Sequence, residues 1–165
     1  MDRVGDLEVD QDLPFERRER RAELVGRSFL ALVVVVALLG AIGAGGPLAW
    51  ADAKGESIDV SYDRFTRRGA TTQLVVRVPA DARAGSNFEV DIDRTYWSRF
   101  QVNAVTPQPA DVTILPEVVR YAFAPEEGAD LEATFTLTPR SVWNVDGDVS
   151  IPDGEPARFW QFLYP

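Results

Sequence analysis

Between residues 28 and 51 the chain carries no charged side chain, although 26% of all its residues are charged. An α-helix rises about 1.5 Å per residue and the hydrocarbon core of a bilayer is about 30 Å thick, so about 20 apolar residues cross it. The uncharged run therefore predicts a single transmembrane helix over residues 28–50. It divides the chain into a short arm, residues 1–27, and a long region that folds beyond the membrane.

The charges on either side of the span predict its direction. Five arginines precede it: Arg17, Arg18, Arg20, Arg21 and Arg27. Lys54 is the one basic residue shortly after it. Because positive residues stay on the cytoplasmic side, we expect a cytoplasmic N-terminus and an extracytoplasmic C-terminal domain at the cell membrane. Arg20, Arg21 and Arg27 would meet lipid headgroups, and Trp50 would be the aromatic anchor at the far interface.

A cleaved signal peptide is the alternative interpretation of the same run. The most apolar stretch, residues 29–39, has the length of a signal-peptide core, and small-x-small cleavage patterns follow at 49–51 and 51–53. The arm is long for a signal peptide and the apolar run continues past residue 39, which favours a retained anchor. In both interpretations the region after the run is extracytoplasmic.

The second half of the span is rich in small residues that repeat at intervals of four. The positions that share this pattern are Ala37, Gly40, Ala41, Ala44 and Gly45. Such a stripe lets a neighbouring helix approach closely, so it is a candidate helix-packing face. The simpler explanation is that glycine and alanine are common in membrane helices.

Local patterns predict the other segments. In the arm, we expect about the first dozen residues to be disordered and a helix to follow, with Asp12 as its N-cap and Pro14 in its first turn. Residues 51–57 are expected to form a linker and residues 58–165 a β-domain. Alternating apolar and polar residues, with turn signals between them, predict strands at 58–62, 74–78, 88–92, 101–105, 112–115, 118–123, 131–137, 142–145, 149–151 and 157–164.

So many short strands in about 110 residues favour an all-β fold, an immunoglobulin-like β-sandwich, with a small barrel as the competitor. Asp146-Gly147 predicts a tight hairpin turn, because such turns need a positive φ. Residues 94–100 break the strand pattern. The spacing of Tyr96 and Phe100 predicts one helical turn there, between two strands.

The residue types present narrow the possible chemistry. Cysteine and histidine are both absent, which removes disulfides, thiolate and histidine-based nucleophiles, and the commonest metal ligands. Residues 52–165 hold 18 acidic and 11 basic residues, a net charge of −7. Such a domain is a poor nucleic-acid binder, and we expect neither a nucleic-acid partner nor a cofactor.

Carboxylates are the remaining candidates for chemistry. Two pairs share a strand face: Asp91 with Asp93, and Asp59 with Asp63. A solvated face explains them more simply than a general acid and base. Four residues near the end of the chain form a candidate calcium cluster: Asn144, Asp146, Asp148 and Asp153. Turns explain this cluster better, because its glycine comes too early for a calcium loop, so we assign no catalytic or metal residue.

The last predicted strand is apolar on both faces. If Phe159 and Leu163 face a core, the alternation places Trp160, Phe162 and Tyr164 on the opposite face. Full burial is one explanation of such a strand, and a protein interface is the other. These three aromatic residues are therefore our candidate partner interface.

Three segments carry a family resemblance: residues 62–74 (YDRFTRRGATTQL), 93–109 (DRTYWSRFQVNAVTPQP) and 159–165 (FWQFLYP). With them the chain resembles a group of uncharacterised actinobacterial single-pass membrane proteins with an extracytoplasmic β-domain. Members of the group are often encoded beside a multi-pass membrane protein of the YetF-like family. The resemblance covers most of residues 15–165 and implies a partner by association, without any active residue.

Together these expectations favour a non-enzymatic, membrane-anchored accessory subunit of a multi-pass membrane protein. Two alternatives remain open. One is a cell-envelope module that binds glycan or lipid, and the other is a hydrolase that uses a pair of carboxylates.

Overall fold

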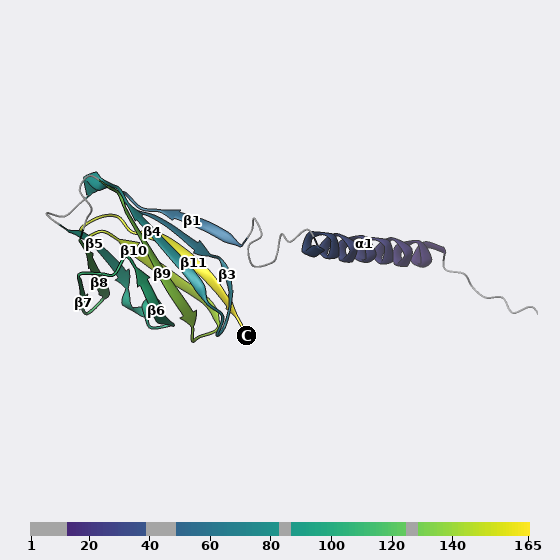
Figure 1. Cartoon of the computed structure of the whole chain (residues 1–165). Helices are drawn as coiled ribbons and strands as arrows, with labels where there is room; N and C mark the ends of the chain where they lie inside the picture. Colours follow the sequence, from purple (N-terminus) through teal and green to yellow (C-terminus); the bar gives the residue numbers. More distant parts are fainter. Residues whose placement is uncertain (1–12, 39–48, 83–86, 125–128) are drawn as a thin grey trace, which may run out of the picture. The chain divides into compact units, whose positions relative to one another are not determined.

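The computed structural model describes residues 13–38, 49–82, 87–124 and 129–165 (Figure 1). The chain divides into two compact units, residues 1–41 and 42–165. The first holds helix α1 (Leu13–Leu38) and the second holds a two-sheet β-sandwich. The predicted all-β sandwich is therefore confirmed for the second unit.

Helix α1 covers the second half of the arm and the first part of the predicted span. In the part of the chain that is described, no helix is both long and apolar enough to cross a membrane. Residues 39–48 lie outside the described residues, and with them Gly40, Ala41, Ala44 and Gly45. Ala37, Arg20 and Arg21 lie in α1, as does Arg27, whose Nη2 is 2.7 Å from Glu23 Oε1. The membrane span stays a prediction.

The sandwich begins earlier than the sequence predicts. Strand β1 (Trp50–Lys54) pairs antiparallel with β2 (Asp59–Asp63). The expected linker over 51–57 and the expected end of the span at Trp50 are therefore both wrong. Ala51 and Ala53 are buried in this strand while its other residues are exposed. Alanine gives only a weak strand signal, which is why the alternation was not predicted.

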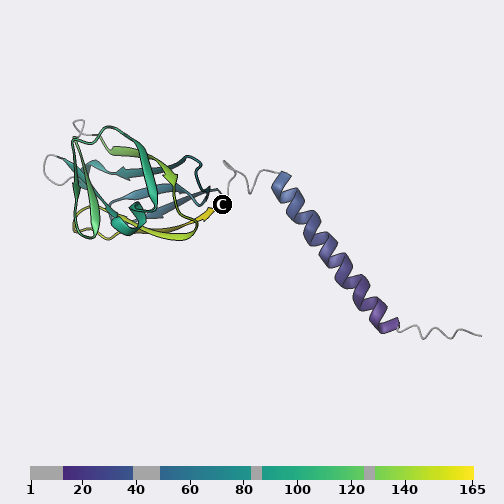
Figure 2. The ribbon, with the colours of Figure 1, turned by 90° about the horizontal axis from the view of Figure 1, so that it is seen from below.

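Two separate sheets make the sandwich, rather than the closed barrel that was the competing prediction (Figure 1, Figure 2). The first sheet contains, in order, β1, β2, β4 (Thr72–Val78), β9 (Leu131–Pro139) and β6 (Phe100–Thr106). The second contains β3 (Phe65–Arg67), β11 (Ala157–Tyr164), β10 (Trp143–Ser150), β5 (Phe88–Asp93), β8 (Val118–Phe123) and β7 (Asp111–Ile114). Each pair of neighbours is antiparallel except β3 and β11, which run parallel.

The core fills the space between the sheets. In β4 and β9 alternate residues are buried, as expected for strands with one face on a core. The core residues run from Ala51 to Leu163, so the sandwich has a hydrophobic core of its own. Its largest fully buried side chains are Tyr96, Phe88, Phe123, Phe135, Leu74, Ile92, Leu137 and Leu163.

The predicted helical turn is present as α2 (Arg94–Trp97), between β5 and β6. Asp93 caps it, since the Tyr96 backbone N–H donates to Asp93 Oδ1 at 2.6 Å. This turn directs Tyr96 into the core, where its ring centroid lies 4.8 Å from that of Phe100 and 5.2 Å from that of Phe159.

The predicted hairpin at Asp146-Gly147 is wrong, because β10 runs unbroken through both residues. Gly147 is instead required for close packing against α2 and β11. A Cβ atom on it would lie 2.8 Å from Tyr96 Cδ2 and 2.8 Å from Phe159 Cζ. The turn into β11 comes later, and Asp153 takes a positive φ of 60° there.

Tyr96 is also the start of a buried hydrogen-bond chain. Its hydroxyl donates to Gln161 Oε1 at 2.7 Å, and Gln161 Nε2 donates to the backbone carbonyl of Asp63 at 2.7 Å. Burial raises the pKa of the Tyr96 phenol far above its usual range, and nearby Tyr62 adds to the rise. The folded state therefore holds Tyr96 protonated.

The Gly147→Ala variant is expected to lose about 1–3 kcal/mol of unfolding free energy, because the added methyl overpacks the contact with Tyr96 and Phe159. Urea denaturation followed by fluorescence measures this loss. Asp148→Ala, at the next and exposed position of the same strand, is the control and should change stability little. Equal stability of the two variants would contradict the close approach at Gly147.

Stability should also fall at alkaline pH because Tyr96 resists ionisation when folded. Its folded pKa is raised, so its contribution is complete below the unfolded pKa of about 10 and is lost as pH rises above it, by about 1.4 kcal/mol per pH unit. Denaturation curves at about pH 8 and about pH 11 measure the difference. Tyr96→Phe should reduce the alkaline loss, whereas Tyr164→Phe, at an exposed tyrosine, should not.

Candidate functional site

Exposed aromatic side chains gather on β3, β10 and β11 of the second sheet. We call them the aromatic patch: Phe65, Trp143, Trp160, Phe162 and Tyr164. The exposed fractions are 64% for Trp143, 45% for Phe65, 43% for Trp160 and 42% for Tyr164, while Phe162 is half-buried. Because surface-exposed aromatic clusters are typical of binding sites, this patch is the candidate functional site.

The alternation along β11 produces the centre of the patch. Phe159, Gln161 and Leu163 are buried in the core, so Trp160 and Tyr164 point outward, as the sequence predicts. Phe162 lies on the same outward face and is half-buried. The strand thus has one buried face and one exposed aromatic face.

Ring contacts join four of the five side chains of the patch in two pairs. Phe65 on β3 lies beside Phe162 in the parallel register, and its ring makes an edge contact with Trp160 at a centroid distance of 6.2 Å. Trp143 contacts Phe162 at 6.3 Å. Such contacts limit side-chain freedom, which lowers the entropy lost when a partner binds.

Trp143 joins the patch through an unusual backbone conformation. Alternation along β10 would place it on the same face as buried Val145, but its φ of 80° breaks the alternation. A non-glycine residue at positive φ costs about 1–3 kcal/mol, and such strain is often found at functional sites. Sequence alone gave no signal for it, because a tryptophan rarely adopts this conformation.

Arg64 borders the patch on the side where the sandwich begins. Its guanidinium carbon lies 5.7 Å from the centre of the Trp160 ring, within cation–π range. Its backbone N–H donates to Ala49 O at 2.7 Å, and its carbonyl accepts from Phe162 N–H at 2.9 Å. The Arg64 Nε is buried and has no hydrogen-bond partner among the described residues.

Polar residues of β10 lie next to the patch. The register places Asn144 opposite Phe162 and Asp146 opposite Trp160. Asn144 and Asp146 also line an open hollow of about 400 Å³, together with Asp93, Thr95 and Arg99. Among the described residues, no three acidic side chains are placed to hold a metal ion, so the calcium interpretation of this cluster has no structural support.

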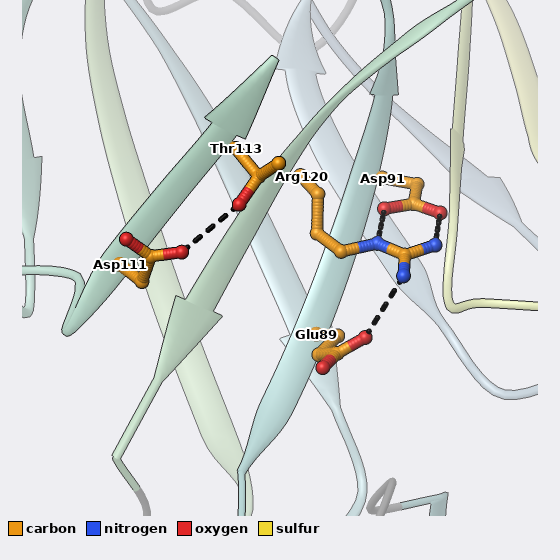
Figure 3. Close-up of polar contacts among 5 residues, drawn as sticks. All are labelled: Glu89, Asp91, Asp111, Thr113 and Arg120. Carbon is orange, nitrogen blue, oxygen red and sulfur yellow. Dashed lines mark hydrogen bonds and ion pairs between the residues drawn. The ribbon is translucent and has the colours of Figure 1, made fainter. Parts of the chain in front are cut away.

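A charged cluster occupies the other half of the same outer face (Figure 3). Arg120 on β8 donates from Nε and Nη2 to both oxygens of Asp91, each at 2.7 Å, and its Nη1 lies 3.3 Å from Glu89. The hydrogen bond to Asp91 raises the pKa of Arg120, against the opposing effect of burial. On neighbouring β7, Thr113 donates to Asp111 at 2.9 Å. The bidentate pair of Arg120 and Asp91 explains why the Asp91 carboxylate is buried: it is a structural group.

The two carboxylate pairs predicted as candidates for chemistry each bind other groups of the protein. Asp91 binds Arg120, and its neighbour Asp93 caps α2. Asp63 accepts from Thr72 Oγ1 at 2.8 Å, and Asp59 lies 3.8 Å from Lys54 Nζ. Their positions therefore give no support to a hydrolase with two opposed carboxylates.

No family model matches the sequence, and no curated protein matches it either. Among solved structures, the chain is similar to a cohesin module from a family 33 glycoside hydrolase of Clostridium perfringens. The two are 14% identical, with a TM-score of 0.41, and the match covers 68% of this chain and 98% of that one. A likeness of this size carries no inference about ligand or partner.

The strain at Trp143 gives a prediction that is independent of any partner. Trp143→Gly should be more stable than Trp143→Ala by about 1 kcal/mol, because both remove the side chain but only glycine adopts a positive φ freely. Chemical denaturation of the two variants measures the difference. The same pair of substitutions at Asn144 is the control and should give the opposite order, since glycine weakens an ordinary strand position. An equal effect at both positions would contradict the strained conformation.

Proposed function

We propose that this chain is a non-enzymatic single-pass membrane protein, in which one transmembrane helix precedes an immunoglobulin-like β-sandwich outside the cytoplasmic membrane. The sandwich binds a multi-pass membrane protein through the aromatic patch and acts as its accessory subunit. The observation that carries the proposal is the patch itself. Five neighbouring aromatic side chains on three strands remain exposed or half-buried in a domain that already has a complete core.

The position of the patch supports a partner in the membrane. Ala49, the first described residue of the sandwich, is hydrogen-bonded to Arg64, which in turn is hydrogen-bonded to Phe162 of the patch. The uncharged run ends at this point of the sequence. With that run as the anchor, the patch lies close to the bilayer surface, within reach of the extracytoplasmic loops of a membrane protein.

The chemistry of the patch supports a protein as the partner. Tryptophan, tyrosine and phenylalanine are enriched at the centres of protein interfaces, and a few such residues carry most of the binding energy. The neighbouring Arg64 and Asp146 provide the polar rim that these interfaces usually have.

The test is recovery of a companion from native membranes in mild detergent. The full chain should sediment with membranes, resist alkaline extraction, and co-purify with a multi-pass membrane protein. The double variant Trp143→Ala/Trp160→Ala should lower the affinity for that companion by more than about 30-fold, because truncating even one central aromatic residue costs about 2 kcal/mol or more.

Ile114→Ala is the matched control. Ile114 is 69% exposed on β7, at the opposite edge of the second sheet, and its truncation should leave recovery unchanged. A chain that leaves the membrane without detergent contradicts the anchor. A chain that stays in the membrane but purifies alone, as a monomer, contradicts the accessory role.

A glycan ligand is the second candidate, and one observation favours it. Trp160 lies opposite Asp146 and Phe162 lies opposite Asn144, so one exposed and one half-buried ring stand beside carboxylate and amide groups, which hydrogen-bond sugar hydroxyls. Titration of the full chain in detergent with cell-wall glycan fragments, followed by tryptophan fluorescence, tests this function. Saturable binding that Asp146→Ala abolishes would favour it, and the absence of any response would exclude it for the fragments used.

A further inference from the structure

Arginines gather at the end of the sandwich where its chain begins and where it ends. Five segments meet there, residues 49–50, 63–72, 98–100, 139–143 and 164–165. Backbone hydrogen bonds join them: Arg64 N–H to Ala49 O, Arg68 N–H to Tyr164 O, Gly69 N–H to Pro139 O, and Arg140 N–H to Arg99 O. The C-terminus lies at this end in Figure 2. We call this region the arginine end.

The charge of the arginine end is opposite to that of the domain. Its segments contain Arg64, Arg67, Arg68, Arg99 and Arg140 but only one acidic residue, Asp63, which gives a net charge of +4. Residues 52–165 as a whole carry −7. The asymmetry creates a positive surface at one end of an otherwise acidic molecule.

No arginine of this end forms an ion pair with a described acidic residue. In the described residues, the ion pairs of the sandwich involve Lys54, Arg77, Arg120 and Arg158, and none of them involves an arginine of this end. Arg67, Arg68, Arg99 and Arg140 are exposed. Among the residues that the structure describes, two buried side-chain polar atoms lack a hydrogen-bond partner, and both, Arg64 Nε and Ser141 Oγ, lie here.

Amphipathic aromatic residues lie beside the arginines. Trp50 is 46% exposed at the start of β1, and Tyr164 is exposed at the end of β11. Tryptophan and tyrosine favour the headgroup layer of a membrane, and arginine binds phosphate through its planar guanidinium. The combination therefore fits a phospholipid surface.

We propose that the arginine end docks on the surface of a bilayer that contains anionic phospholipid. The inference rests on the proposed function in one respect: the anchor brings this end to the membrane, because β1 starts at Trp50, within the last residues of the uncharged run. The arginines then bind lipid phosphates and hold the sandwich in a fixed orientation.

The four tryptophans provide a direct test, because all of them lie in the sandwich and none lies in residues 28–48. The full chain with Trp50→Phe is reconstituted into vesicles of phosphatidylcholine alone, or of phosphatidylcholine with phosphatidylglycerol. Both carry phospholipid brominated near the headgroup. The exposed reporters are then Trp143 and Trp160, since Trp97 is buried. Quenching should be strong in the anionic vesicles, weak in the neutral ones, and reduced by salt.

Charge-matched variants locate the contact. Arg67→Gln/Arg68→Gln should lower the ratio of docked to undocked sandwich on the order of 25-fold, because each arginine near an anionic surface strengthens binding about fivefold. The control, Arg77→Gln/Arg158→Gln, removes the same charge from exposed arginines of the other segments and should leave quenching unchanged. Circular dichroism checks that both variants are folded.

Each outcome separates docking from anchoring. If the chain floats with both kinds of vesicle but its tryptophan fluorescence is quenched equally in both, the anchor is supported and the docking proposal is wrong. Chains that float with neither kind overturn both proposals. If Arg67→Gln/Arg68→Gln leaves quenching intact but lowers recovery of a companion protein, the arginine end is a protein interface, and the lipid proposal is wrong.

Discussion

One buried polar chain fixes the arrangement on which the rest of the sandwich depends. Tyr96 on α2 donates to Gln161 on β11, and Gln161 donates to the backbone at the end of β2. Buried polar groups cost free energy unless they are hydrogen-bonded. The polar groups of α2, β11 and β2 form these hydrogen bonds only when β11 keeps its observed register. A slip of β11 by one residue would turn Gln161 to solvent and Trp160 into the core. The buried hydrogen bond between Tyr96 and Gln161 therefore determines that the aromatic side chains of β11 point outward.

The outer face of the second sheet is divided by this arrangement into two chemically different halves. Around β5 and β8, the charged side chains are paired: Arg120 forms ion pairs with Asp91 and Glu89. Around β3 and β11, aromatic rings are exposed and Arg64 has an unsatisfied nitrogen. A surface with unsatisfied groups gains more from a partner than one whose charged groups are already paired, which is why we propose that binding takes place at the second half.

Local patterns in the sequence predicted most strands and the helical turn, because each depends on neighbours a few residues away. β8 and β11 have the predicted bounds, and Asp93 caps α2 where the strand pattern breaks. Contacts between distant residues had no such signal. The Asp146-Gly147 pair has the sequence of a hairpin turn, but Gly147 is present because Tyr96 and Phe159 pack closely against it, and this contact has no local signal. Phe65 and Trp143 were missed in the patch, since one depends on a parallel pairing with β11 and the other on a strained φ.

That parallel pairing has a consequence for how the domain is made. β3 has β11 as its neighbour in the second sheet, and β11 is the last strand of the sandwich to be synthesised. Until β11 arrives, the hydroxyl of Tyr96 lacks its acceptor and β3 lacks its sheet. The second sheet of the sandwich is accordingly incomplete until β11 has been synthesised.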